Sequence, residues 1–405
     1  MRRAVFAVLI LGLLSAINLF AQSDVEFSGQ IRPRSIMDGL DFKNNSDPAT
    51  YTELRTRFGA KFTANSDVSG FFQIQDSRIY GTEPNTLAST ANLDLHQAYF
   101  TWSNIFGLPL SGKFGRMEAV YGSQRLIGPV GWSNVGRSFD GAVFSYKTNK
   151  VDFDFIEFNL DENFKAGDTT DLFLTGVYAD LKLFDKYKTE VFLLNEAIYQ
   201  TDNLDRYTIG AYVKGSLGSF SHEVELAYQL GTIIDGGTKQ DVGALMATYN
   251  AWFALGGTMN TTLSAGVDYL SGDDDAADGK YKVFNTLYAT NHKYYGYMDY
   301  FTNLPAHTLK LGLMDIHGKV SLQLWESLKA GLNAHLFKAN ANYTLINGNT
   351  SKDFGTEFDF TFGYKANSNV SLEGGFSVFA PGDIFKETRG ADTALWSYFM
   401  AVVNL

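Results

Sequence analysis

The stretch GRMEAVYGSQRLIGPVGWSNVGRSFDGAVFSY, residues 115–146, is the part of the sequence from which the rest can be interpreted. Both of its ends alternate between apolar and polar residues, as strands with two different faces do, because successive side chains point to opposite sides. The middle is a loop that contains Arg125, Trp132, Asn134 and Arg137. Loops longer than about 12–15 residues are uncommon in compact domains and are usually functional. The stretch therefore predicts two strands joined by a long functional loop.

The first 21 residues have the layout of a secretory signal peptide. Arg2 and Arg3 precede an apolar run from Ala4 to Leu14, and small and polar residues lead to Ala21. The apolar run is shorter than the roughly 20 residues that a transmembrane helix needs. We expect cleavage near Ala21, so that residues 22–405 leave the cytoplasm without a helical anchor and form a single domain.

The composition favours strands and excludes several classes of function. The chain has 39 Gly, 33 Phe and 22 Tyr but only 7 Pro, which suits strands joined by tight turns. It has no Cys, so neither disulfides nor thiolate metal sites can form. The formal net charge is −11, and it becomes more negative when Arg2 and Arg3 are removed, which argues against a nucleic-acid partner.

Two segments show what the alternating faces carry. Leu54, Phe58 and Phe62 share an apolar face, and Arg55 and Arg57 share the opposite one. A second segment opposes Phe354, Phe358, Phe360 and Phe362 to Glu357, Asp359 and Thr361. In a soluble sandwich the apolar face would form the core. In a membrane barrel lipid covers the apolar face, and an aqueous lumen takes the charges.

Three features favour the membrane barrel. Aromatic residues at strand ends would form the interfacial belts: Tyr51, Trp102, Tyr146, Tyr178 and Tyr364. Short connections alternate with long ones, as periplasmic turns and extracellular loops do; the long ones are residues 35–50, 121–137, 271–306 and 381–393. The last segment, ending at Leu405, would close the barrel by pairing with Val25–Arg34.

Eighteen strand-like segments can be counted, an even number, as single-chain bacterial barrels require. They begin near Asp24, Glu53, Val68, Leu93, Leu110, Ser138, Val151, Asp171, Lys188, Arg206, His222, Asp241, Thr258, His307, Leu328, Phe354, Asn369 and Leu395. A barrel of this size leaves an aqueous channel unless it is plugged. No plug domain is expected, because the first strand begins within a few residues of the predicted cleavage site. We predict an all-β, antiparallel transmembrane barrel in the bacterial outer membrane.

Three stretches resemble the alginate export family of outer-membrane channels. Residues 115–141 follow the pattern GRxExxYGxQRLIGPxxWSNxGRSFDG, Asp94–Tyr99 reads DLHQAY, and Phe284–Phe301 reads FNTLYATNHKYYGYMDYF. They occur in the family's order. The remainder of the chain resembles the family only in the alternating apolar and polar pattern of its strands. The resemblance implies an eighteen-stranded barrel with an electropositive constriction through which a polyanionic polysaccharide crosses the membrane.

Basic residues on the polar faces are the candidate pore-lining residues. Arg32, Arg34, Arg55, Arg57 and Lys61 could form a cationic ladder for carboxylates, which arginine binds in bidentate fashion. They could equally form ion pairs that stiffen the wall, with Glu26, Glu53 and Asp94 as partners.

Other candidates lie in the family-like stretches. Arg116, Arg125 and Arg137 are predicted to line the pore, with Glu118 and Asp140 orienting them. His96 and His292 are expected to pack or to form hydrogen bonds rather than to bind a metal.

Two further groups allow alternatives. Asp273–Asp275 with Asp278 could bind calcium, but no twelve-residue ligand pattern follows, which favours an exposed acidic loop tip. The four tyrosines between residues 294 and 300 could stack on sugar rings or pack a loop into the barrel mouth.

We predict a passive channel that moves an anionic polysaccharide outward, with outer-membrane lipid and periplasmic export machinery as partners. The alternative is a porin for small anionic solutes. A third class, an adhesive or catalytic barrel, would have a blocked lumen. No enzyme is expected, because the sequence has no GxSxG or other nucleophile motif, and no cofactor is predicted.

Overall fold

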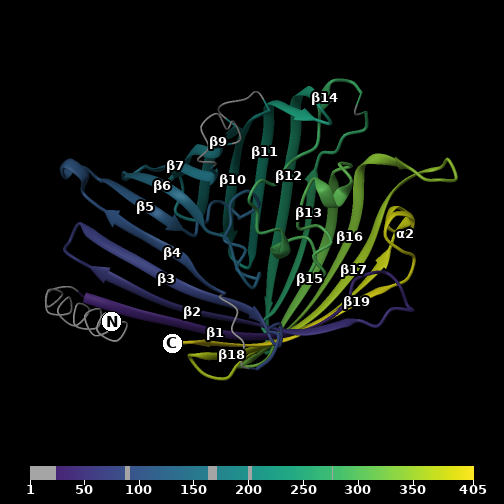
Figure 1. Ribbon diagram of the computed structural model, residues 1–405, viewed down its shortest axis with the longest axis horizontal. Coiled ribbons are helices and arrows are strands. Elements are labelled where there is room, and N and C mark those ends of the chain that lie inside the picture. The colour runs from purple at the N-terminus through teal and green to yellow at the C-terminus, as the bar shows by residue number, and fades with distance from the viewer. Residues whose placement is uncertain (1–23, 87–91, 163–170, 199–202, 276) are drawn as a thin grey trace.

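The structure is a computed structural model that describes residues 24–86, 92–162, 171–198, 203–275 and 277–405 (Figure 1). The predicted signal peptide, residues 1–21, lies outside the described residues. The chain forms a closed antiparallel β-barrel, as Figure 1 shows. Within the described part of the chain, no helix is long and apolar enough to cross a membrane.

In the described part of the chain, eighteen strands form the barrel wall, which confirms the predicted number. Each strand pairs with its neighbour in the chain, and β1 also pairs with β19. The short β14 (Lys280–Tyr281) lies in a loop and pairs in parallel with β12. The wall strands are β1 (Asp24–Gly39), β2 (Ala49–Thr63), β3 (Val68–Ile79), β4 (Leu93–Trp102), β5 (Leu110–Met117), β6 (Phe139–Lys147), β7 (Val151–Asp161), β8 (Leu172–Leu181), β9 (Tyr187–Ile198), β10 (Leu204–Leu217), β11 (Phe220–Asp235), β12 (Thr238–Gly256), β13 (Thr261–Leu270), β15 (Leu313–Trp325), β16 (Leu328–Thr344), β17 (Thr350–Lys365), β18 (Val370–Pro381) and β19 (Ala394–Asn404).

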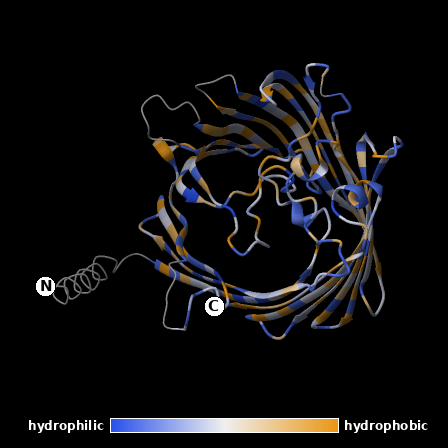
Figure 2. Cartoon of the chain, turned by 45° about the vertical axis from the view of Figure 1, so that its right-hand side comes forward, coloured by the Kyte–Doolittle hydropathy of each residue, from blue (hydrophilic) through white to orange (hydrophobic). Residues whose placement is uncertain are grey.

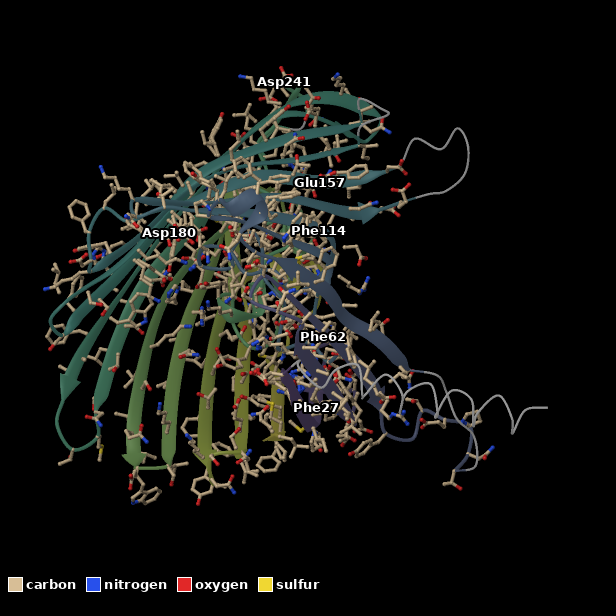
Figure 3. The ribbon with its side chains drawn as sticks, turned by 90° about the vertical axis from the view of Figure 1, so that its left-hand side faces the viewer. Phe27, Phe62, Phe114, Glu157, Asp180 and Asp241 are labelled. Atoms are coloured by element: carbon tan, nitrogen blue, oxygen red, sulfur yellow. The ribbon has the colours of Figure 1, made fainter. Side chains whose placement is uncertain are left out.

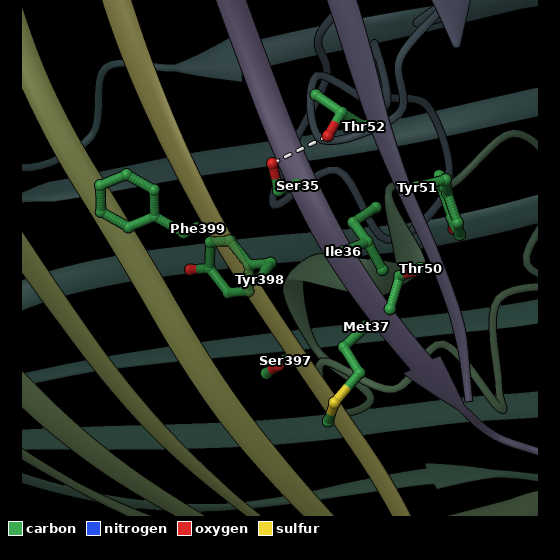
Figure 4. A pocket seen from close by; sticks show the side chains of 9 residues that line it. All are labelled: Ser35, Ile36, Met37, Thr50, Tyr51, Thr52, Ser397, Tyr398 and Phe399. Atoms are coloured by element: carbon green, nitrogen blue, oxygen red, sulfur yellow. Dashed lines mark hydrogen bonds between the residues drawn. The ribbon is translucent and has the colours of Figure 1, made fainter. Parts of the chain in front are cut away.

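The barrel closes between β1 and β19, as predicted. Ile31 pairs with Val403 and Ser35 pairs with Phe399, and the pairing extends to Gly39. It skips the positions around Pro33, because proline has no N–H to donate. Figure 4 shows this seam from close by, with the hydrogen bond of 2.9 Å between the Ser35 and Thr52 hydroxyls of β1 and β2.

The outer surface of the barrel is apolar. Hydrophobic and hydrophilic residues alternate along the strands in Figure 2, and Figure 3 labels Phe27, Phe62 and Phe114 among the aromatic side chains. Phe27 is 67% exposed and Phe360 is 51% exposed. Exposed aromatic and aliphatic side chains recur on nearly every strand, far beyond the patches that monomeric soluble proteins show. The apolar face therefore meets lipid, and the charged face lines the lumen.

The connections at the two ends of the barrel differ in length. Residues 64–67, 148–150, 218–219 and 366–369 form short turns at one end. Residues 118–138 and 271–312 form long loops at the other end, and Figure 2 shows loops inside the ring of strands. The loops and short turns also contain the helices η1 (Ile105–Gly107), η2 (Asn291–Lys293), η3 (Ala306–Thr308) and α2 (Asp383–Thr388).

The buried core lies inside the barrel, where the inward loops pack against the wall. Phe301 packs against Phe337 (4.5 Å between ring centroids) and Phe354 (5.4 Å). The prediction that Phe354 faces lipid is therefore wrong. The β16–β17 register shifts next to Gly355, whose φ of +140° breaks the alternation at this point and turns Phe354 inward.

Two of the five predicted belt residues also lie inside. Tyr178 is buried and stacks on Tyr121 of the inward loop at 4.4 Å, and Tyr51 is partly buried against the core. They occupy inward-facing positions of their strands. The other three are exposed near the short-turn end: Trp102, Tyr146 and Tyr364.

Candidate functional site

Two loops meet inside the barrel and narrow the lumen. The constriction loop, residues 118–138, joins β5 to β6, and the facing loop, residues 271–312, joins β13 to β15. They pair side by side, because Gly128 N–H donates to Tyr288 O (2.9 Å) and Tyr288 N–H donates to Leu126 O (2.8 Å). Thr290 N–H extends the pairing to Gln124 O (2.9 Å). This pairing fixes the position of the constriction.

Four arginines of β1 and β2 hold the constriction loop against the wall. Arg32 and Arg55 each donate to the carbonyl oxygens of Gly131 (2.9 Å) and Ser133 (3.0 Å). Arg34 donates to Trp132 O (2.8 Å), and Arg57 donates to Val135 O (3.2 Å). Carbonyl oxygens carry no full negative charge, so these hydrogen bonds do not neutralise the guanidinium groups. The four side chains therefore form a row of positive charge beside the loop, which we call the arginine row: Arg32, Arg34, Arg55 and Arg57.

Two carboxylates partly balance this row. Glu53 pairs with Arg34, and Glu118 pairs with Arg57 at 3.2 Å. Burial acts to raise the pKa of Glu118, but the hydrogen bond with His96 and the charge of Arg57 hold it below its ordinary value. Glu53 is one of the ion-pair partners predicted for these arginines, whereas Arg32 and Arg55 are buried beneath the loop.

The fifth predicted basic residue lies apart from the row. Lys61 pairs with Glu26 at 3.4 Å, nearer the short-turn end, and both side chains are exposed. Asp94 is exposed and forms no ion pair with any described residue.

A serine, a histidine and a carboxylate meet where the loop joins β6. The His96 ring lies 2.8 Å from Glu118 Oε1 through Nε2 and 3.2 Å from Ser138 Oγ through Nδ1. The Ser138 hydroxyl donates to the backbone oxygen of His96 (2.6 Å), so its proton is not directed at the imidazole. His96 is buried, with 2% of its surface exposed. The three groups fasten the end of the loop to β4.

Arg125 attaches the other part of the constriction loop to strands distant from β5 and β6. Its guanidinium is fully buried and binds the Asp268 carboxylate of β13 through Nε (3.1 Å) and Nη2 (2.7 Å). It also lies 3.6 Å from the centroid of the Tyr294 ring. Burial acts to lower the pKa of Arg125, but the combined effect of Asp268, Tyr294, Tyr295 and Glu225 outweighs burial, and the pKa lies well above its ordinary value. Arg125 is therefore a permanently charged tether.

Arg137 joins the two loops. Its Nη1 donates to Ala289 O (2.9 Å) and to Tyr288 O. One face of its side chain lines a cavity of about 450 Å³ between the loops and β1, β2 and β19. We call this cavity the vestibule.

Arg116 and Asp140 do not lie in the lumen. They pair with each other at 2.6 Å, and both are substantially exposed. They occupy the same faces of β5 and β6 as Phe114 and Phe144, which contact each other on the outer surface. The prediction of a pore-facing Arg116 oriented by Asp140 is therefore corrected, because alternation from Phe114 places Arg116 outside.

Aromatic rings line the vestibule beside the arginines. Trp132 stacks on His292 (4.3 Å, 10° between planes) and meets the edge of Tyr398 at 4.9 Å. The Arg34 guanidinium lies 4.3 Å from the Trp132 ring centroid. His292 Nδ1 bonds to Asp299 Oδ1 (2.6 Å), which orients the imidazole. The vestibule thus combines guanidinium groups with flat aromatic surfaces.

The facing-loop tyrosines have different environments. Tyr294, Tyr295 and Tyr300 are buried, so they pack the loop, whereas Tyr297 lines the vestibule. The acidic tip of the same loop is exposed, and Lys282 lies between Asp274 (2.8 Å) and Asp278 (2.9 Å).

Many acidic side chains line the lumen on β9–β17, a feature that our sequence reasoning did not single out. They are buried and partly bonded to the loops; Glu196, for instance, accepts a hydrogen bond from the Tyr288 hydroxyl (2.7 Å). The group comprises Glu190, Glu196, Glu223, Glu225, Asp268, Asp315, Glu357 and Asp359. The sequence feature that could have identified these acidic residues is their position on the polar face of each strand.

Comparison with known proteins links the sequence to one family. The family described as alginate export matches residues 25–396, nearly the whole chain. A comparison with curated proteins finds no match.

Solved structures share the fold at low sequence identity. OccAB4 of Acinetobacter baumannii superposes with a TM-score of 0.62 at 11% identity, covering 95% of this chain and 99% of that one. OccK5 (OpdH) of Pseudomonas aeruginosa gives 0.60 at 12% identity, covering 94% and 98%. The outer-membrane protein OpdK of the same organism gives 0.59 at 12% identity, with the same coverage.

Proposed function

The chain belongs to the alginate export family, and we propose that it passes an anionic polysaccharide outward through its arginine-lined lumen. The family and the barrel fold are those of bacterial outer-membrane channels. The observation that carries the proposal is the vestibule, where Arg34 and Arg137 lie beside the Trp132 ring.

A polyuronate presents two chemical features that this surface suits. Its carboxylates can bind guanidinium groups, which offer planar pairs of donors. The apolar faces of its sugar rings can pack on aromatic side chains, and Trp132, His292 and Tyr297 line the vestibule. Cationic charge in a narrow passage with low-dielectric walls attracts anions more strongly than the net charge of the protein repels them, because field lines are focused there.

The direction of transport depends on where the polymer is made. A passive pore has no preferred direction, so we propose that periplasmic export machinery delivers the polysaccharide to the short-turn end. Deletion of the channel should then trap polymer in the periplasm. If deletion instead abolished growth on a small anionic nutrient while export continued, inward transport would be the function.

A porin for small anionic solutes is the second candidate, and one observation favours it. The constriction loop is fastened on both sides, by the arginine row and by the Arg125–Asp268 pair. A compact solute could pass beside a loop held in this way, whereas a polymer needs a continuous passage.

Conductance measurements in planar bilayers test the proposal. The native channel should prefer anions in a salt gradient, and polyuronate should block it while a neutral polysaccharide of similar size should not. Replacing Arg34 and Arg137 by Gln should weaken both effects, whereas Lys at these positions should retain the anion preference. Arg116→Gln is the matched control, because it removes one positive charge from the outer surface.

A native channel that prefers cations and ignores polyuronate would refute the proposal. Block by monomeric uronate that does not strengthen with chain length would favour the small-solute porin.

A further inference from the structure

Strands β15 and β16 bring one carboxylate and two imidazoles together on the lumen wall. His317 and His335 are direct cross-strand partners, and Asp315 precedes His317 by two residues on the same face. Asp315 Oδ2 lies 2.9 Å from His335 Nδ1 and 3.2 Å from His317 Nδ1. All three residues are buried, and among the described residues they form the one group with metal-ligand spacing. We propose that they bind a divalent transition-metal ion of the Zn²⁺ class.

The outer nitrogens of both imidazoles face oxygen atoms. His317 Nε2 lies 2.7 Å from Asn250 Oδ1, and His335 Nε2 lies 3.9 Å from Asp359 Oδ2. When Nε2–H faces an oxygen acceptor, Nδ1 carries the lone pair that a metal ligand needs. Two such lone pairs then point toward the Asp315 carboxylate, and a cation between them removes the repulsion. Ser377 holds Asp359 in turn, through a hydrogen bond of 2.6 Å to Oδ1.

Several oxygen atoms of this cluster have no hydrogen-bond partner among the described residues. They are Asp315 Oδ1, Asp359 Oδ2 and Glu357 Oε2, and all three residues are 0% exposed. Buried carboxylates without partners are costly, so such groups are normally paired or bind metal ions. Asp268, the cross-strand neighbour of Asp315, is already neutralised by Arg125. Lys319 on the same face adds one positive charge, which leaves negative charge for a divalent ion to balance.

A cavity adjoins the cluster on the side of His317. This cavity, of about 190 Å³, is lined by His317, Asn250 and Lys319. Gly266 lies between the strands that carry Asn250 and His317, and a Cβ atom at this position would collide with both side chains. The absence of a side chain there makes room for the contact between Asn250 and the imidazole.

The donor set determines the class of ion. Imidazole nitrogen suits Zn²⁺ and the other late first-row ions, whereas Ca²⁺ and Mg²⁺ prefer oxygen ligands throughout. Two His ligands with one carboxylate leave a coordination position open for water. The ion would join β15 to β16 and neutralise part of the acidic wall. This inference is independent of the transported solute.

Metal binding by the full-length, untagged chain in detergent tests the proposal. After treatment with a chelator, the chain should take up one Zn²⁺, and Co²⁺ should give visible ligand-field absorption. Replacing either ligand, as His317→Gln or His335→Gln, should weaken binding by more than the roughly 10- to 100-fold that loss of an outer-shell partner costs. Asn250→Ala should fall within that range. His222→Gln, on β11, is the matched control and should bind as the native chain does.

Two measurements distinguish loss of the metal site from misfolding of a variant. Heat-modifiable migration on gels reports whether each variant forms the barrel. X-ray absorption at the zinc edge of the native chain should show nitrogen ligands at about 2.0–2.1 Å, without any substitution. The proposal is overturned if the chelated native chain takes up no Zn²⁺, if the ligand shell contains only oxygen, or if folded His317 and His335 variants bind normally.

Discussion

Removing the Arg125 tether should loosen the constriction loop without unfolding the barrel. Arg125→Met retains a long apolar side chain but removes the guanidinium that binds Asp268. Both partners are fully buried, so the substitution leaves an unpaired carboxylate inside the protein. The barrel hydrogen bonds of β13 lie in the wall and remain intact. We therefore expect the loop to detach from β13 while the strands stay paired.

The expected loss is that of a buried ion pair. Breaking a buried ion pair by removing one partner costs about 3–5 kcal/mol. The cation–π contact with Tyr294, at 3.6 Å, is lost as well. At about 1.4 kcal/mol for each factor of ten, 3–5 kcal/mol shifts the docking equilibrium of this part of the loop by roughly two to three and a half orders of magnitude. Residues 131–135 should stay attached, because the arginines of β1 and β2 hold them.

Hydrogen exchange and single-channel recording together measure this change. The amides of Gly128, Tyr288 and Thr290 form the pairing between the two loops, so their protection should fall. Conductance should rise, and its fluctuations should become larger as the loop moves. Heat-modifiable migration should be unchanged, since the wall remains closed.

A second substitution separates the ion pair from other effects. Asp268→Asn added to Arg125→Met removes the unpaired carboxylate, so the double variant should regain part of the lost protection. The coupling energy should lie in the upper part of the ~0.5–3 kcal/mol range seen for contacting residues. Unchanged protection and conductance in Arg125→Met would refute the tether. Simple additivity of the two substitutions would refute the ion pair as its cause.

Three further predictions concern the wall, the seam and the vestibule. Phe360→Arg places a charge against lipid, so it should destabilise the folded barrel by ~2–4 kcal/mol near the bilayer midplane and reduce folding into lipid vesicles. Thr361→Arg, on the lumen side, should fold normally. Equal tolerance of the two substitutions would contradict the assigned faces. Deleting residues 396–405 removes most of the strand that pairs with β1 and should prevent assembly, measured as the fraction of heat-modifiable protein; normal assembly would disprove the closure. Trp132→Ala should weaken block by polyuronate several-fold, in line with the ~0.5–1.5 kcal/mol of an aromatic contact, and leave ion selectivity nearly unchanged; unaltered block would exclude the ring as a contact.

The barrel was predictable from the sequence because its determinants are local. Side chains alternate between two faces along a strand, so a period of two assigns each residue to one face. Consecutive antiparallel strands turn at opposite ends of the barrel, so the long connections can all lie at one end. The eighteen strands, the asymmetric ends and the β1–β19 closure follow from these patterns. The long loop at residues 118–138 was also recognisable, since its length and its arginines stand out from the alternating texture.

The tertiary structure alone decided what the charged side chains contact. Arg32 binds the carbonyl of Gly131, 99 residues away, because the constriction loop folds into the barrel, and no local pattern encodes that path. Arg116 and Arg125 lie in the same family-like stretch, yet strand alternation places Arg116 on the outer surface. Arg125 lies inside the barrel and binds Asp268, which is 143 residues away in the sequence. His317 and His335 meet through the β15–β16 register, which depends on the whole sheet. Periodicity specifies the face on which a residue lies, whereas its partner is chosen by register and loop path, which are set by long-range packing.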